Sequence, residues 1–141
     1  MRTTIGAYEI DVDVAATRAF YTGAPTLAVP CSCPGCRNFP GAIRRLPQET
    51  AALLERLGID PANPAEQWAE CALDGGSSVL YGAFWHLCGT IVSGPAETGG
   101  TMEPVHISTR CGLVPQGFPE PVLQLDMHLR LPWVLAEQNT I

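Results

Sequence analysis

Three cysteines lie within six consecutive residues, 31–36, which read CSCPGC. The spacing Cys33-x-x-Cys36 is typical of a metal knuckle, in which a tight turn directs two thiolates at one ion and points backbone N–H groups toward the sulfurs. The proline and glycine between the two cysteines suit such a turn. The sequence therefore predicts a tetrahedral zinc site, which needs one further ligand if Cys31 also binds and two if it does not.

Candidates for the missing ligand lie further along the chain, because no second C-x-x-C is present. His86 and Cys88 alternate with apolar residues and share one face of the strand expected over 79–92. The other candidates are single residues on strand positions and are less favoured: Cys71, His106 and Cys111. We therefore expect His86 to complete a structural Zn²⁺ site with Cys31, Cys33 and Cys36.

The same cysteines have a redox interpretation. A C-x-x-C that follows an apolar strand and precedes a helix has a first thiol of lowered pKa, so Cys33 would be the nucleophile and Cys36 the resolving thiol. Two features oppose this interpretation: the next helix is expected only from Asn38, and the chain lacks the alternating βαβ pattern of thioredoxin-like proteins. The three isolated cysteines, by contrast, are expected to pack as small hydrophobic side chains: Cys71, Cys88 and Cys111.

Composition limits the class of protein. The chain has 141 residues, 46% of them hydrophobic, and a net charge of −6, which fits one globular domain spanning residues 1–141. The acidic balance argues against a nucleic-acid partner, and no segment reaches the roughly 18 apolar residues of a membrane span. Glu9, Asp11 and Asp13 stand where an export signal would be apolar. We expect a cytoplasmic protein, whose cysteines more often bind metal or act in catalysis than form disulfides.

Hydrophobic periodicity predicts an α+β fold, with an antiparallel sheet of about four or five strands and two helices inserted after the first strand. The expected strands cover residues 4–14, 66–73 (with a short helix as the alternative), 79–92, 105–111 and 123–131. The expected helices cover residues 38–46 and 48–57, with a shorter one over 15–21, and a loop is expected over 93–104.

Two further groups of residues could form a site. If the last two strands pair with His106 opposite His128 and Ser108 opposite Asp126, one sheet face would carry the groups for metal or acid–base chemistry, although an ordinary solvated face is the preferred interpretation. The aromatic residues could line a pocket, but they fit a core, or a homodimer or protein-partner interface, better: Phe39, Trp68, Phe84, Trp85 and Trp133. No glycine-rich nucleotide motif and no G-x-S-x-G motif occurs.

Several of these features occur together in the order C-x-C-x-x-C-R-N-F, L-G-I-D, P-A-E and finally Y-G-A-F-W-H with a glycine three residues later. Over about residues 5–92 the chain resembles a family of small bacterial proteins of uncharacterised activity that carry a CxCxxCRN(F/Y) motif and a YGxxWHxxG strand. The resemblance implies that His86 and the cysteine stretch belong to one domain, and it implies no reaction. The sequence thus favours a zinc-containing binding or assembly module, with a thiol-dependent redox enzyme as the alternative.

Overall fold

The computed structural model describes residues 1–96 and 104–141. In this part of the chain, three α-helices and two short 3-10 helices accompany six strands that form one antiparallel sheet. The strands are β1 (Arg2–Ile5), β2 (Tyr8–Val12), β3 (Glu66–Leu73), β4 (Ser78–Ser93), β5 (Val105–Ser108) and β6 (Val122–Pro132). The helices are α1 (Val14–Gly23), α2 (Pro34–Ala42), η1 (Ile43–Arg45), α3 (Gln48–Arg56) and η2 (Asp74–Gly76). The expected α+β class is confirmed, and the strand expected over 66–73 is present instead of its helical alternative.

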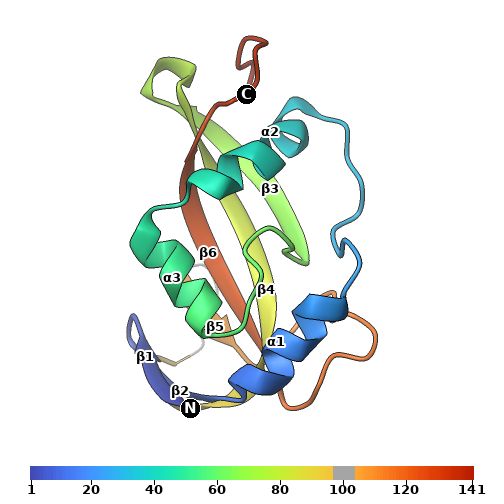
Figure 1. The fold of residues 1–141 in the computed structure, drawn as a ribbon. Coiled ribbons are helices and arrows are strands. Elements are labelled where there is room, and N and C mark those ends of the chain that lie inside the picture. The colour runs from blue at the N-terminus through green and yellow to red at the C-terminus, as the bar shows by residue number, and fades with distance from the viewer. Residues whose placement is uncertain (97–103) are drawn as a thin grey trace.

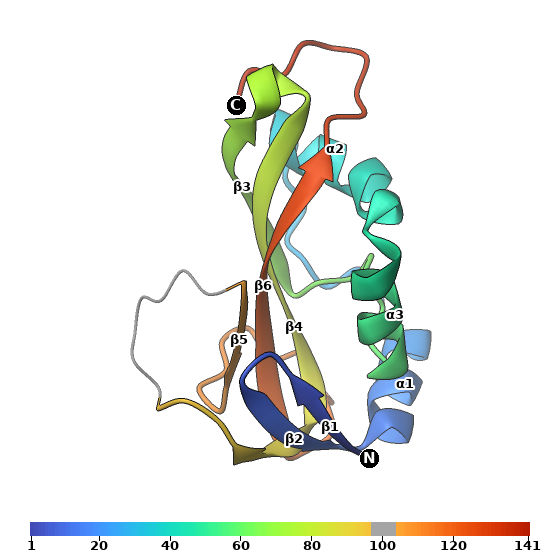
Figure 2. The ribbon, with the colours of Figure 1, turned by 90° about the vertical axis from the view of Figure 1, so that its left-hand side faces the viewer.

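The sheet has the order β1-β2-β4-β6-β5, and β3 also pairs with β4. β3 pairs with residues 78–84 of β4 and β2 with residues 89–93, while β6 runs along the opposite edge of β4 from Ser78 to Cys88. The three α-helices cover one face of the sheet, and β5 lies toward the other side (Figures 1 and 2). The long strand β4 is therefore the centre of the molecule.

β4 is buried on both of its faces from Tyr81 to Gly89, as the apolar residues on both sides of its alternation predict. Tyr81 and Trp85 are completely buried on the face that the helices cover, and they belong to the main hydrophobic core. Phe84 and His86 alternate with them on the opposite face and are also buried. A cysteine loop that packs against the helical face can therefore contact Tyr81 but not His86.

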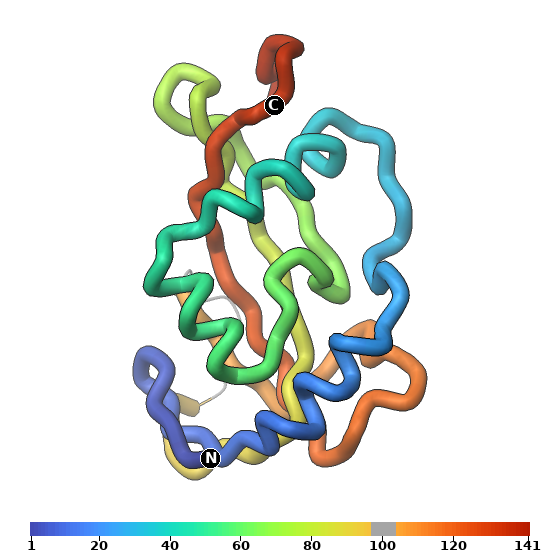
Figure 3. Tube along the Cα trace, in the orientation of Figure 1, coloured from blue at the N-terminus to red at the C-terminus, as the bar shows by residue number. Residues whose placement is uncertain are grey.

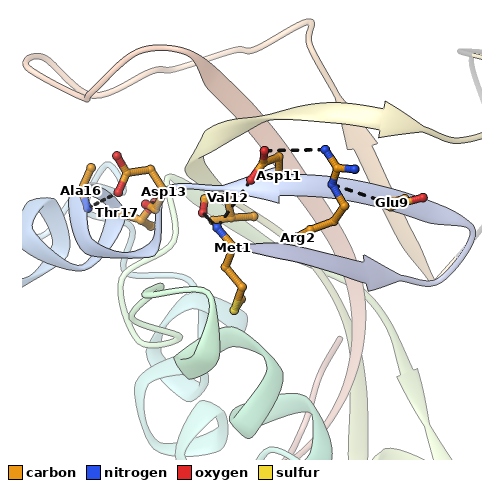
Figure 4. Close-up of polar contacts among 8 residues, drawn as sticks. All are labelled: Met1, Arg2, Glu9, Asp11, Val12, Asp13, Ala16 and Thr17. Atoms are coloured by element: carbon orange, nitrogen blue, oxygen red, sulfur yellow. Dashed lines mark hydrogen bonds and ion pairs between the residues drawn. The ribbon is translucent and has the colours of Figure 1, made fainter.

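The N-terminal segment forms a hairpin where one strand over 4–14 was expected. Gly6 adopts a positive φ of 57° and reverses the chain between β1 and β2. Across this hairpin Arg2 forms ion pairs with Glu9 and Asp11 on the exposed face (Figure 4). The expected single strand was wrong because the alternation of Tyr8, Ile10 and Val12 does not extend back through the turn: the buried Ile5 lies three residues before Tyr8.

α1 begins where the sequence offers a strong cap. The Asp13 carboxylate accepts a 2.9 Å hydrogen bond from the backbone N–H of Ala16, and the Asp13 carbonyl accepts one from the Thr17 hydroxyl (Figure 4). The Thr17 hydroxyl in turn accepts a hydrogen bond from the backbone N–H of Cys88. The cap therefore fixes the start of α1 against β4.

α2 begins four residues before the position that the sequence predicted. Cys33 is its N-cap and Pro34 occupies its first turn, where a missing N–H costs little. The helix that was expected over 38–46 is thus wrong at both ends, since η1 replaces its last turn. The helix expected over 48–57 is confirmed as α3.

The register of the last hairpin also differs from the prediction. His106 lies opposite Asp126, and Ser108 lies opposite Gln124, so His106 does not face His128. A shift of two residues keeps every side chain on its own face, and alternation alone cannot detect it. Of the loop expected over 93–104, residues 97–103 lie outside the described residues.

Candidate metal centre

The cysteine cluster consists of Cys31, Cys33 and Cys36, whose sulfur atoms all lie within 4.8 Å of one another. It is the single group of three or more potential metal ligands that close together in residues 1–96 and 104–141. Cys31 and Cys33 are exposed, and Cys36 is partly buried. The extended segment after α1 leads along the side of the molecule to the first turn of α2 and so brings Cys31 to the other two cysteines (Figure 3).

The start of α2 closes the C-x-x-C loop from within. The backbone N–H of Cys36 donates a hydrogen bond to the Cys33 sulfur at 3.4 Å, and the backbone N–H of Arg37 donates to the Cys33 carbonyl oxygen. The guanidinium of Arg37 donates to the Ser32 carbonyl at 3.0 Å and forms a two-pronged ion pair with Glu137. Backbone and side-chain contacts together hold residues 32–37 in one turn.

The loop rests on the buried part of β4. The Tyr81 hydroxyl donates a 2.6 Å hydrogen bond to the carbonyl oxygen of Gly35 and accepts one from the Asn38 amide. Asn38, itself fully buried, also accepts a hydrogen bond from the backbone N–H of Val134. The sequence places Tyr81 on the strand expected over 79–92 and Asn38 at the start of an expected helix, and it predicts no contact between them. Buried polar side chains need hydrogen-bond partners. That requirement could have predicted a polar contact for a tyrosine on a buried strand.

Gly35 is required by the close approach of α2 to β3. A Cβ atom at this position would lie 2.8 Å from the Cβ of Ala69, which is closer than two such atoms approach. The glycine therefore allows the first turn of α2 to pack directly on the strand.

The thiols of Cys33 and Cys36 are electrostatically unequal. The pKa of Cys33 is lowered, first by the N–H of Cys36 and then by hydrogen bonds from the Cys31 and Cys36 thiols. The pKa of Cys36 is raised to about 12, first by burial and then by hydrogen bonds to its two neighbours. The thiolate form of Cys33 is thus favoured, whereas deprotonation of Cys36 at neutral pH needs a cation beside it, as metal binding provides.

A groove of about 530 Å³ opens beside the cluster; we call it the cysteine groove. Its walls are largely apolar, and they include side chains that remain well exposed: Val29 at 83%, Leu113 at 62%, and Trp68 and Ile141 at 38%. Glu66 and Gln67 supply its main polar groups. A molecule bound in this groove would lie against both the apolar walls and the three cysteines that line it.

The structure does not bring His86 to the cluster. Its Nε2 atom lies 2.9 Å from the Gly112 carbonyl oxygen, and its ring packs between those of Phe84 and Phe118, at centroid distances of 5.8 and 5.9 Å. Burial lowers the pKa of this imidazole. Its Nδ1 atom is buried and has no hydrogen-bond partner in the described structure.

The isolated cysteines differ in burial. Cys88 is buried, and its thiol donates to the Glu120 carbonyl at 3.5 Å, which agrees with the expected packing role. Cys71 is exposed on β3, so the expectation that it packs was wrong. It follows the irregularity between Ala69 and Cys71 in the pairing of β3 with β4, which alternation along the sequence does not show. Cys111 is half-buried.

The histidines of the second sheet face have separate neighbours. The His128 ring lies 3.4 Å from the Glu70 carboxylate, while the His106 ring meets the edge of Tyr8. The pKa of Asp126, between them, is raised mainly by burial. In the described residues these groups do not form a set of three ligand atoms as close as the cysteine cluster, which supports the interpretation as an ordinary sheet face.

The aromatic side chains are mostly internal. Phe39, Phe84 and Trp85 are buried, and Trp133 is half-buried with its indole N–H donating to the Glu137 carbonyl. Trp68 stays partly exposed at the rim of the cysteine groove. An aromatic contact with a partner would therefore involve Trp68.

Within the described residues, the helices are all too short or too polar to cross a membrane. Comparisons with protein-family models, with curated proteins and with solved structures returned no match to this chain.

Proposed function

We propose that this protein binds one zinc ion through Cys31, Cys33 and Cys36 and serves as a binding or assembly module. The mutual approach of the three sulfurs to within 4.8 Å carries the proposal. Three thiolates suit a soft or borderline cation, and among these zinc needs no redox partner and accepts the tetrahedral geometry of short cysteine loops. His86 has no part in this proposal, because its ring contacts Gly112 and two phenylalanines instead.

The metal would stabilise the segment that leads into α2. Cys31 belongs to an extended chain that has few internal hydrogen bonds, whereas Cys33 and Cys36 belong to the helix start. A shared ion would tie that chain to the helix, and its binding free energy would add to the stability of the fold. In this role the site is structural, and the surfaces around it remain available for partners.

Elemental analysis of protein purified without chelators tests the proposal. We expect about one zinc per chain, loss of that zinc in Cys36→Ser, and full retention in Cys71→Ser, which removes an exposed thiol outside the cluster. If the reduced wild-type protein neither contains zinc nor binds it from solution while its thermal unfolding stays cooperative, the zinc proposal is wrong.

The position of Cys33 supports a second candidate function, thiol–disulfide exchange. Because α2 begins directly after Cys33, the objection that the helix starts late no longer applies. The Cys33 thiolate would attack a disulfide of the substrate and form a mixed disulfide while one substrate thiolate leaves. Cys36 would then attack the Cys33 sulfur, which releases the second substrate thiol and leaves a Cys33–Cys36 disulfide.

A metal-free sample separates the two candidates. A redox enzyme would reduce a small aromatic disulfide rapidly, would accumulate the mixed disulfide in Cys36→Ser, and would be inactive in Cys33→Ser. A zinc module would react at the rate of an ordinary exposed thiol, and zinc would suppress that reaction.

A thiolate zinc site with two exposed cysteines fits a reducing compartment, and this supports the proposed cytoplasmic location. The net charge of −6 supports partners other than nucleic acid. We also propose that the chain belongs to the small bacterial proteins with the CxCxxCRN(F/Y) motif, a proposal that the sequence motifs support.

A further inference from the structure

We propose that the fourth coordination position of the bound metal opens into the cysteine groove and takes a neutral nitrogen heterocycle with an apolar body, supplied from outside the chain. The inference rests on the proposed zinc site and adds to it a class of ligand. An imidazole or a fused azole has the required donor.

The cysteine cluster supplies fewer donor atoms than a tetrahedral zinc ion takes. In the described part of the chain, the cluster contains three thiols and no fourth cysteine, histidine or carboxylate. The three histidines of the sequence have neighbours elsewhere: His86 contacts Gly112, His106 contacts Tyr8 and His128 contacts Glu70. As far as the described residues go, a tetrahedral zinc ion held by these three thiolates therefore keeps one coordination position open.

The shape and the apolar surface of the cysteine groove limit which ligands can reach the metal. The cysteine groove reaches all three cysteines and continues along the segments 28–30 and 65–69, the second of which leads into β3, and along Leu113. Its apolar walls disfavour a small hydrated ligand and favour one with a ring or hydrocarbon body.

Leu113 provides an independent sign that this wall contacts a ligand. Its φ of 51° lies in the left-handed region that a leucine side chain disfavours, and 62% of the residue is nevertheless exposed at the groove. Burial in the core does not account for an apolar residue in this strained position. A ligand in the groove would cover the exposed Leu113 side chain and remove its apolar surface from water.

The negative charge at the metal and in the groove favours a neutral ligand. A zinc ion with three thiolates has a net charge of −1, and the Glu66 carboxylate lines the same groove. The guanidinium of Arg37, the residue that follows Cys36, forms an ion pair with Glu137. An additional anion would be repelled, whereas a neutral imidazole nitrogen completes a Cys3His set, which zinc commonly adopts.

Cobalt-loaded full-length protein tests the inference, because Co²⁺ reports its ligands in the visible spectrum. Thiolate-to-cobalt charge-transfer bands without added ligand would support the metal site on its own. We expect imidazole and benzimidazole to shift the d–d bands, benzimidazole to bind about tenfold more tightly because its added ring is buried, and acetate to cause no shift. If the charge-transfer bands form but neither azole shifts the d–d bands, this inference fails and the metal proposal stands.

Two variants sharpen the result. Leu113→Asn should relieve the backbone strain and raise the unfolding midpoint, yet reduce the preference for benzimidazole over imidazole without changing cobalt affinity. Glu66→Gln should also leave cobalt affinity unchanged. Loss of cobalt in Glu66→Gln, or a four-thiolate spectrum before any ligand is added, would overturn the inference.

A final pair of probes identifies the source of the ligand. A short acetylated peptide with a histidine between two leucines competes with benzimidazole for the cobalt site. Tighter binding of the peptide would assign the position to a histidine of a partner protein, and tighter binding of benzimidazole would assign it to a free small molecule. Failure of both to bind contradicts the proposal.

Discussion

The hydroxyl of Tyr81, which is buried near the start of β4, donates a 2.6 Å hydrogen bond to the backbone carbonyl of Gly35, which lies between two cysteines of the cluster. The core strand and the candidate metal loop are thus joined directly. Asn38 donates a hydrogen bond to the same hydroxyl. Removing the Tyr81 hydroxyl would therefore leave both the Gly35 carbonyl and the Asn38 amide without this partner.

Tyr81→Phe removes this hydroxyl and little else. We expect a loss of about 1–3 kcal/mol in the free energy of unfolding, because a buried carbonyl and an amide lose a partner, together with weaker zinc binding. Tyr21→Phe is the matched control, since the Tyr21 hydroxyl is also buried but bonds to the backbone of His86. The control should lose similar stability and keep its zinc affinity, as measured by denaturant unfolding and chelator competition. Equal loss of zinc affinity in both variants would show that the bond to Gly35 has no specific effect.

Gly35→Ala tests the contact between α2 and β3. Alanine is intrinsically the better helix former, but its Cβ would overlap that of Ala69, so we expect a net destabilisation of about 1–3 kcal/mol and reduced zinc affinity. Adding Ala69→Gly should restore much of both quantities. Gly23→Ala, at the end of α1 with open space around it, should leave both nearly unchanged. A stabilised Gly35→Ala protein would contradict the proposed packing.

Zinc affinity should increase with pH. In the metal-free protein the pKa of Cys36 is raised to about 12, so this thiol is protonated at neutral pH and zinc must displace its proton. Each displaced proton increases the apparent affinity about tenfold per pH unit. Competition with a zinc indicator between pH 6 and pH 8, corrected for the indicator's own protonation, measures the slope. Cys71→Ser should give the wild-type slope, and a flat profile would exclude Cys36 as a ligand.

His86→Leu should change stability and its pH dependence rather than metal content. Burial lowers the pKa of His86 in the folded state, so the unfolded chain binds a proton that the folded chain does not as pH falls through the unfolded value of about 6.5. The stability that the fold gains from keeping this ring neutral is therefore fully present above that pH and is lost as the pH falls below it. Denaturant unfolding of metal-free protein at neutral and mildly acidic pH should show a smaller decrease in the variant than in wild type. A well-folded His86→Leu protein without zinc would instead identify His86 as a ligand.

The sequence predicted the sheet well because most strands have one strongly apolar face. Tyr8, Ile10 and Val12 alternate with acidic residues, and all three are buried as the pattern requires. The start of α2 was missed because cysteine is an unusual N-cap, although Pro34 in the first turn was a usable signal.

The site was only partly predictable. Cysteine spacing alone brought Cys33 and Cys36 together, and Cys31 followed from its proximity in the chain. His86 could not be assigned in the same way, because its position relative to the cluster depends on which face of β4 the helices cover. Side chains alternate between the two faces of a strand, so His86 and Tyr81, five residues apart, lie on opposite faces of β4. α2 packs on the face that carries Tyr81.

β4 pairs with β3 along its first half, with β2 along its second half and with β6 along most of its length. Neither half of the sheet can detach without exposing the backbone of this one strand. The slowest amide hydrogen exchange should consequently occur along the whole of β4 with a single protection value, so that the region beneath the cysteines and the N-terminal hairpin open in the same global event.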